Sequence, residues 1–174
     1  GTYTLTTSIG MGTSGDVTSG PIRVRGYTTT IGDGGRPTIT ANNDTFPIFS
    51  LSADVVTLES LNLTYTGASR GPGLRPGTAK QSGSALLDMS ITGCSLGIDS
   101  DWSTYYALYQ LMMVNVEIAS CTSHGISAGA GLWLIDCYIH DNAGDGWRHG
   151  QYNAAYFCDL TAVRTVFSNN AGIQ

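Results

Sequence analysis

Apolar and polar positions alternate along this chain in a pattern that recurs five times. Each copy has two inward-facing residues two positions apart, and a small polar or thiol residue follows three positions after the second. The copies are Leu61 and Leu63 with Thr66, Met89 and Ile91 with Cys94, Val116 and Ile118 with Cys121, Cys137 and Ile139 with Asn142, and Thr165 and Phe167 with Asn170. The second residues of successive copies are 28, 27, 21 and 28 positions apart. Repeats of this length predict a solenoid, in which each rung buries its apolar face only against its neighbours.

A second alternating segment precedes each copy and predicts an additional strand in every rung. Its inward positions are Val56 and Leu58, Leu86, Leu111 and Met113, Leu132 and Leu134, and Leu160 and Ala162. The break between the two strands is occupied by Ser60, Asp88, Asn115, Asp136 and Arg164, and we expect a short bend there. Another bend is expected at the small polar residue that ends each copy, where Asn142 and Asn170 would tolerate left-handed backbone.

Composition favours strands over helices. No 11-residue window keeps apolar residues three and four apart, and Thr, Val, Ile and Tyr dominate the apolar runs. The chain has 23 Gly and only 8 Lys plus Arg. This composition is rich in turn formers and poor in long charged helix formers, so it predicts an all-β fold.

The phrases ITGCSLGI and CYIHDNAGDGW, the Asn corners and the ladder of Leu, Ile and Phe together resemble the right-handed parallel β-helix of the pectate-lyase-like superfamily, which includes many phage tailspikes. The resemblance implies a single-stranded solenoid of about five to seven rungs with inserted loops. The resemblance covers residues 50–174. The regular rungs look incomplete at the C-terminus, so we expect either that the sequence is part of a longer chain or that a partner caps it. Residues 1–49 are interpreted as an N-terminal cap and first irregular rungs.

Charge and hydropathy narrow the range of partners. The formal net charge is −5, which argues against binding to duplex nucleic acid, because phosphate neutralisation needs a surplus of Lys and Arg. No run of 18 apolar residues predicts a membrane span, and no secretion leader is visible. With the tailspike resemblance, we expect a virion or extracellular location.

The four cysteines are expected to be free thiols. Cys94 and Cys121 fall at the same position of neighbouring copies, where buried thiols would fill a stack of corners. Cys137 occupies an inward position, and Cys158 lies just before one. No spacing matches a zinc motif.

Three inserted loops are the places where a solenoid of this kind would carry function. Residues 67–84 contain Arg70, Arg75 and Lys80, and are interpreted as a mobile exposed excursion or an anion-binding loop. Residues 99–110 and 145–157 each carry aromatic residues and should leave the coil on the same side. Aromatic rings edged by charged groups suit a sugar, although the same rings could instead cover the coil. The candidate carbohydrate-binding residues are Trp102, Tyr105, Tyr106, Tyr109, Trp147, Arg148, His149 and Tyr152.

Candidates for catalysis and metal binding are sparser. The phrase LWLIDCYIH echoes one found in pectate lyases, but has Cys137 where that phrase has His. The carboxylates that could flank a glycosidic bond, and the histidine among them, are Asp136, Asp141, Asp145 and His140. His124 is interpreted as a corner or surface residue. No cofactor is expected, but Ca²⁺ is possible at Asp99 and Asp101, or between Asp88 and Asp136 if these stack.

These observations predict a structural and glycan-recognition module of a phage or viral tail or capsid appendage. Its expected partners are cell-surface or environmental polysaccharide, other virion proteins or further parts of a longer chain, and two more copies in a homotrimer. The alternative is a polysaccharide lyase or glycoside hydrolase of the same superfamily. A third alternative, an ice-binding solenoid, would need regular threonine ladders on one flat face, whereas threonine is scattered along this sequence apart from TYTLTT and TTT.

Overall fold

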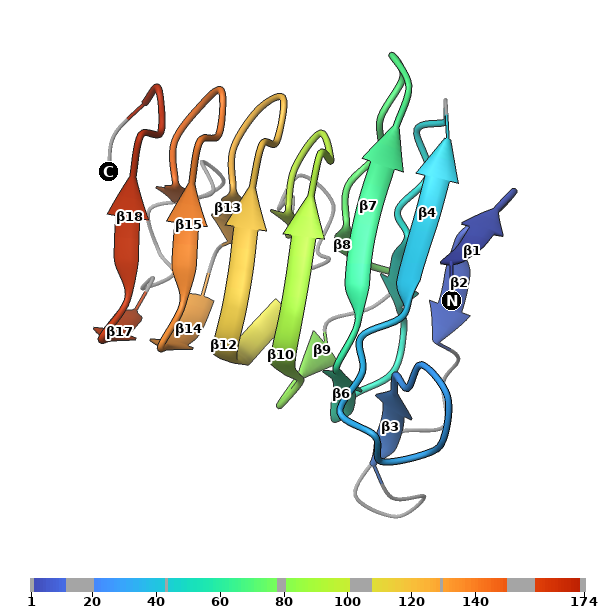
Figure 1. Ribbon diagram of the computed structural model, residues 1–174. Helices are drawn as coiled ribbons and strands as arrows, with labels where there is room; N and C mark the ends of the chain where they lie inside the picture. The colour runs from blue at the N-terminus through green and yellow to red at the C-terminus, as the bar shows by residue number, and fades with distance from the viewer. Residues whose placement is uncertain are drawn as a thin grey trace.

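The protein is all-β in the computed structural model, which describes residues 2–11, 21–42, 44–77, 81–100, 108–128, 130–149 and 159–172. These residues form two sheets of parallel strands and contain no helix (Figure 1). The architecture is consistent with a parallel β-helix. None of the described segments forms a helix long and apolar enough to cross a membrane.

The larger sheet contains two sets of strands that follow one another in the chain. Its members are β1 (Thr2–Leu5), β3 (Ile22–Arg25), β4 (Thr38–Asn42), β6 (Val56–Glu59), β7 (Asn62–Thr66), β9 (Gln81–Ser82), β10 (Ala85–Thr92), β12 (Leu108–Ala119), β14 (Ala130–Ile135), β15 (Tyr138–His140), β17 (Leu160–Val163) and β18 (Val166–Ser168). The smaller sheet contains β2 (Ile9–Met11), β5 (Phe49–Leu51), β8 (Leu74–Pro76), β11 (Ile98–Asp99), β13 (Ile126–Ala128) and β16 (Trp147–His149).

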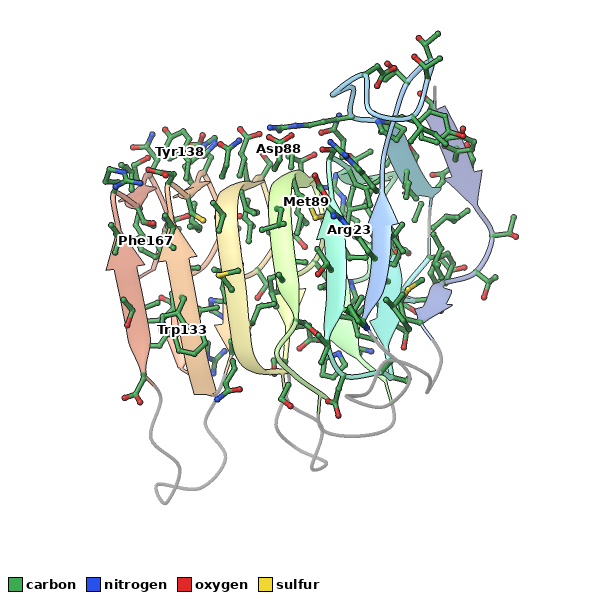
Figure 2. The ribbon with its side chains drawn as sticks, turned by 90° about the horizontal axis from the view of Figure 1, so that it is seen from below. Arg23, Asp88, Met89, Trp133, Tyr138 and Phe167 are labelled. Carbon is green, nitrogen blue, oxygen red and sulfur yellow. The ribbon has the colours of Figure 1, made fainter. Side chains whose placement is uncertain are left out.

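The strand register confirms the five-copy pattern. The second inward residues, Leu63, Ile91, Ile118, Ile139 and Phe167, are paired from one strand to the next. The preceding segments are stacked in the same way, because Leu86 pairs with Leu58 and with Met113. The aligned apolar rows face the interior, where side chains such as Met89 are fully buried (Figure 2).

Left-handed backbone occurs at each predicted bend between the two strands. The φ angles of Ser60, Asp88, Asn115, Asp136 and Arg164 lie between 48° and 54°. Three of these five are Asp or Asn, the types that adopt this conformation most readily after glycine. The sequence therefore located this corner correctly.

The corner after the second strand differs from the expectation by one residue. The left-handed residues are Asp141 and Asn169, and not the expected Asn142 and Asn170. Asn142 and Asn170 are buried at 2% and 5% exposure. Their amides bond neighbouring corners. Asn142 Oδ1 accepts from the Cys121 N–H at 3.0 Å, and Asn170 Oδ1 accepts from the Asn142 N–H at 3.2 Å and from Asn142 Nδ2 at 2.8 Å. Asparagine is thus placed here for its amide and not for its backbone freedom.

Two strands of the smaller sheet lie within segments that the sequence predicted as loops. β8 falls within residues 67–84, and Gly71 to Leu74 are buried, so this part of the segment is not the expected exposed excursion. β16 likewise falls within 145–157. Glycines precede these strands because a side chain there would overlap the next strand; a Cβ on Gly97, for example, would lie 2.5 Å from the Gly125 carbonyl oxygen.

Three of the four cysteines fall in described residues, and all three agree with expectation. Cys94, Cys121 and Cys137 are free and buried. Burial raises the pKa of the Cys121 thiol to about 12 and also raises the pKa of Cys94 and Cys137. Cys158 lies outside the described residues.

Candidate functional site

A polar cluster lies on the outward face of the larger sheet, over β10, β12, β15 and β18. The residue between the two inward positions of each copy points outward, because side chains alternate along a strand. Ser90, Glu117 and Tyr138 occupy this position on adjacent strands. His140 and Ser168 are paired two residues further along β15 and β18. With Asp141, these residues form what we call the Glu117–His140 cluster.

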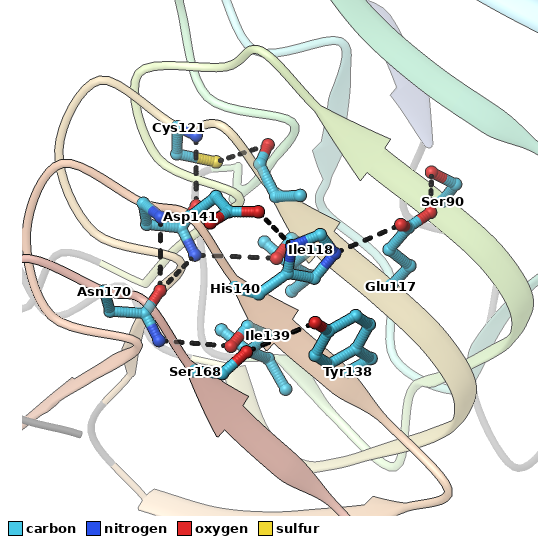
Figure 3. Close-up of polar contacts among 12 residues, drawn as sticks. Ser90, Glu117, Ile118, Cys121, Tyr138, Ile139, His140, Asp141, Ser168 and Asn170 are labelled. Carbon is cyan, nitrogen blue, oxygen red and sulfur yellow. Dashed lines mark hydrogen bonds and ion pairs between the residues drawn. The ribbon is translucent and has the colours of Figure 1, made fainter.

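The imidazole of His140 lies between two carboxylates (Figure 3). Its Nε2 is 3.2 Å from Glu117 Oε1, and its Nδ1 is 2.7 Å from Asp141 Oδ2. Ser90 Oγ donates to the other Glu117 oxygen at 2.9 Å. Carboxylates only accept hydrogen bonds, so a doubly protonated imidazole satisfies both contacts. The His140 side chain is 15% exposed, whereas those of Glu117 and Asp141 are 44% and 54% exposed and can reach a ligand.

The phenol ring of Tyr138 covers the imidazole. The two rings are stacked with centroids 3.8 Å apart and an interplanar angle of 20°. Ser168 Oγ donates to Tyr138 Oη at 3.2 Å, which fixes the free end of the ring. Tyr138 is 43% exposed, so the cluster presents an immobilised aromatic side chain beside two carboxylates.

The electrostatics of Asp141 follow from this arrangement. The hydrogen bond from His140 lowers the pKa of the Asp141 carboxyl below its usual value. Asp141 therefore remains ionised to lower pH than an ordinary aspartate. The cluster provides a persistent negative charge next to a ring nitrogen that can carry a proton.

The structure brings together only two of the four catalytic candidates, His140 and Asp141. Asp136 lies at the bend at the opposite end of β15 and accepts two hydrogen bonds from Arg164, at 2.5 and 2.7 Å, which lower its pKa. Asp145 lies at the beginning of the smaller-sheet segment, where its Oδ2 is 3.2 Å from His124 Nδ1.

His124 also connects Asp145 to a predicted carbohydrate-binding residue. Its Nε2 lies 3.0 Å from Arg148 Nη1. His124 therefore holds a carboxylate and a guanidinium on either side of one ring, a role that the sequence did not indicate. Trp147, which precedes Arg148 in β16, packs against the core.

The remaining carbohydrate-binding candidates lie partly within the described residues. Trp102, Tyr105, Tyr106 and Tyr152 lie outside the described residues. For Tyr109 in β12 and His149 in β16, only the backbone is described. The segments that carry these residues begin on β11 and β16, which both pair with β13 in the smaller sheet.

The acidic residues proposed for Ca²⁺ have partners within the protein. Asp99 is 3% exposed and accepts two hydrogen bonds from Arg75, at 2.6 and 2.9 Å. Asp88 bonds Arg36 and accepts from Asn115 Nδ2 at 2.7 Å. Asp101 lies outside the described residues. No group of three or more His, Cys, Asp or Glu side chains suited to a metal occurs in the described part of the chain.

Sequence reasoning missed Glu117, Tyr138, Ser90 and Ser168. The repeat indicated their outward positions, because each of them directly precedes or follows an inward-facing residue of a copy. Reading the outward positions of successive copies as a column would have placed Glu117 beside Tyr138.

Comparisons with protein-family models, curated proteins and solved structures give no match to this chain.

Proposed function

We propose that this chain is a right-handed parallel β-helix that acts as a structural and glycan-recognition module. Support for the coil comes from the strand order: each pass of the chain contributes to both sheets, and successive passes pair in parallel and in register. Such a stack gives a rigid surface, on which ligand-binding side chains lose little conformational freedom when they bind.

The observation that carries the glycan proposal is the Tyr138 ring, stacked on His140 and bordered by Glu117 and Asp141. Sugars combine an apolar ring face with hydroxyl groups around the edge. An immobilised aromatic ring suits the first, and exposed carboxylates that accept hydrogen bonds suit the second. All of these groups lie on strands or at a strand end, and not on long loops.

The proposal is tested by glycan-array binding followed by calorimetry on the glycans that bind. Tyr138→Ala is expected to weaken binding by roughly 5- to 30-fold, because an aromatic contact of this size contributes about 1–2 kcal/mol. Trp133→Ala is the matched control, since Trp133 is 41% exposed on the same sheet and makes no described contact with the cluster.

Equal binding by wild type and Tyr138→Ala would contradict glycan binding at the Glu117–His140 cluster. The same array tests the carbohydrate-binding surface that the sequence predicted, because binding by Trp102→Ala and Trp147→Ala can be measured on the same glycans. Loss of binding in those variants alone would show that glycan binding takes place at the segments 99–110 and 145–157.

A second candidate function is hydrolysis or lyase cleavage of the bound glycan. The observation that favours it is the pair of exposed carboxylates on either side of one imidazole, which could supply and accept protons across a glycosidic bond. New reducing ends or unsaturated products formed from a bound polysaccharide would establish this activity.

The biological setting extends the proposal. We place the module in a phage or viral tail or capsid appendage, because of the tailspike resemblance of residues 50–174. Its partners would then be surface polysaccharide and other virion proteins, and a homotrimer is the expected assembly.

A further inference from the structure

Threonine side chains that are scattered along the sequence are brought into one column on the larger sheet. Thr4 pairs with Thr40, Thr40 with Thr64, and Thr64 with Thr92, although these residues are 24 to 36 positions apart. They project outward from β1, β4, β7 and β10, the last three of which lie side by side in Figure 1. The expectation from sequence that no threonine ladder exists is therefore wrong.

A second polar column runs beside the first. Thr2, Thr38, Asn62 and Ser90 are paired across the same four strands, two residues earlier in each. Together the two columns form what we call the hydroxyl face. Its repeat is about 4.8 Å between strands and roughly 6.6 Å between alternate residues of one strand.

The threonine column is available to solvent. Thr40, Thr64 and Thr92 are half-buried between their neighbours, and Thr4 is exposed. In the described part of the chain, no protein group hydrogen-bonds the hydroxyls of these four residues. In the second column, Asn62 Nδ2 donates to the Arg36 carbonyl and Ser90 Oγ donates to Glu117.

The hydroxyl face itself carries no ionisable side chain. The Arg36–Asp88 ion pair lies near the beginning of its strands, and Arg70, which bonds the Gly93 carbonyl, lies near their end. On the next strand, β12, Glu117 is paired with Ser90 and marks the edge of the hydroxyl face. The face is thus an array of hydroxyl, methyl and amide groups bounded by charge.

We propose that the hydroxyl face binds ice. Hydroxyls at a fixed repeat can take the place of oxygen atoms in a crystal layer, and the strand spacing is close to the repeat of oxygen rows on the prism faces of hexagonal ice. The intervening methyl groups favour ordered water without competing for its hydrogen bonds. Charged side chains, which would impose a different hydration, lie only around the edge. This function does not require glycan binding at the Glu117–His140 cluster, with which the hydroxyl face shares only Ser90.

The test measures thermal hysteresis and inhibition of ice recrystallisation with the whole chain. Wild type is expected to show both activities. Thr64→Lys, in the middle of the threonine column, is expected to lose most of them, because it inserts a flexible charge into the array. Thr161→Lys is the matched control: Thr161 is exposed on β17 of the same sheet, away from the hydroxyl face, and this variant is expected to retain wild-type activity.

Circular dichroism and a thermal unfolding midpoint establish that both variants are folded before the comparison is made. A folded wild-type protein with no hysteresis and no effect on recrystallisation would overturn the proposal. So would equal activity in Thr64→Lys and Thr161→Lys, since that result would place ice binding on another surface.

Discussion

At the scale of single residues, the corner asparagines show how a polar side chain stabilises the interior. Asn142 accepts from the Cys121 N–H and donates to Asn170, so each amide satisfies a buried group in an adjacent corner. In the two earlier copies Cys94 and Cys121 occupy the same place, and their thiol groups lie 3.6 and 3.8 Å from carbonyl oxygens two residues earlier. The corner can therefore be filled by a small apolar thiol or by a fully bonded amide.

Asn142→Ala is expected to lower the free energy of unfolding by about 1–3 kcal/mol, because it leaves the buried Cys121 N–H without an acceptor. It also removes one of the two hydrogen bonds to Asn170 Oδ1, which keeps the bond from the residue 142 backbone N–H. Denaturant unfolding followed by circular dichroism measures the change. Asn42→Ala, at an exposed position of β4, is the control and should change stability by less than about 0.5 kcal/mol. A similar effect in both variants would mean that the amide ladder contributes nothing.

The pKa of Asp141 reports on the Glu117–His140 cluster. Since the hydrogen bond from His140 lowers this pKa in the folded state, its stabilising contribution is present above the ordinary aspartate pKa and is lost as pH falls through the lowered value. His140→Phe keeps a ring against Tyr138 but removes the donor, and should raise the Asp141 pKa towards its usual value. Carboxyl chemical shifts followed against pH measure this change.

Asp136 supplies the internal control for that titration. Arg164 holds its pKa down independently of His140, so its titration should be the same in both proteins. If the Asp141 curve also stayed unchanged, the contact between His140 and Asp141 would be absent in solution.

At the scale of strands and bends, the sequence predicted two strands of each rung and missed the third. The strands of the larger sheet show apolar alternation over several residues, and their bends carry small polar residues, so both were visible. The strands of the smaller sheet have only two or three residues, as in Ile98–Asp99, which is too short for a period of two to emerge. The strand Trp147–His149 was also harder to predict because its aromatic and charged residues indicated a binding loop.

One bend departs from the residue types that its conformation favours. Val55 has a φ of 54°, and the register places Gly83, Gln110 and Gly131 at equivalent positions of the next three passes, where they are also left-handed. Left-handed backbone costs an L-residue about 1–2 kcal/mol. Val55→Gly is therefore expected to increase stability by about 0.5–1 kcal/mol after the entropic cost of glycine.

Thermal unfolding measures the effect of Val55→Gly. Thr57→Gly, two residues later in β6 with ordinary strand backbone, is the matched control and is expected to decrease stability by about 0.5–1 kcal/mol. A decrease in both variants would show that the Val55 side chain contributes more through packing than its backbone conformation costs.

At the scale of the whole molecule, the register of the stack creates both proposed surfaces. It brings Glu117 next to His140 across 23 positions of sequence, and it aligns four threonines whose spacing in the chain is irregular. The sequence revealed the inward columns because apolar residues mark them clearly. The outward columns are chemically mixed, so their own residue types do not mark them. Within the five copies their alignment follows from the inward columns, whereas Thr4 and Thr40 precede the first copy and are aligned only by the structure.

Chemical-shift mapping by NMR with a glycan fragment selected on the array tests the central claim most directly, and the chain of 18.3 kDa is suited to it. Glycan recognition at the Glu117–His140 cluster predicts shift changes centred on Glu117, Tyr138, His140 and Ser168, with loss of these changes in Tyr138→Ala and their retention in Trp133→Ala. Shift changes confined to β16 and the segments around it, with none at Tyr138 or His140, would contradict the claim.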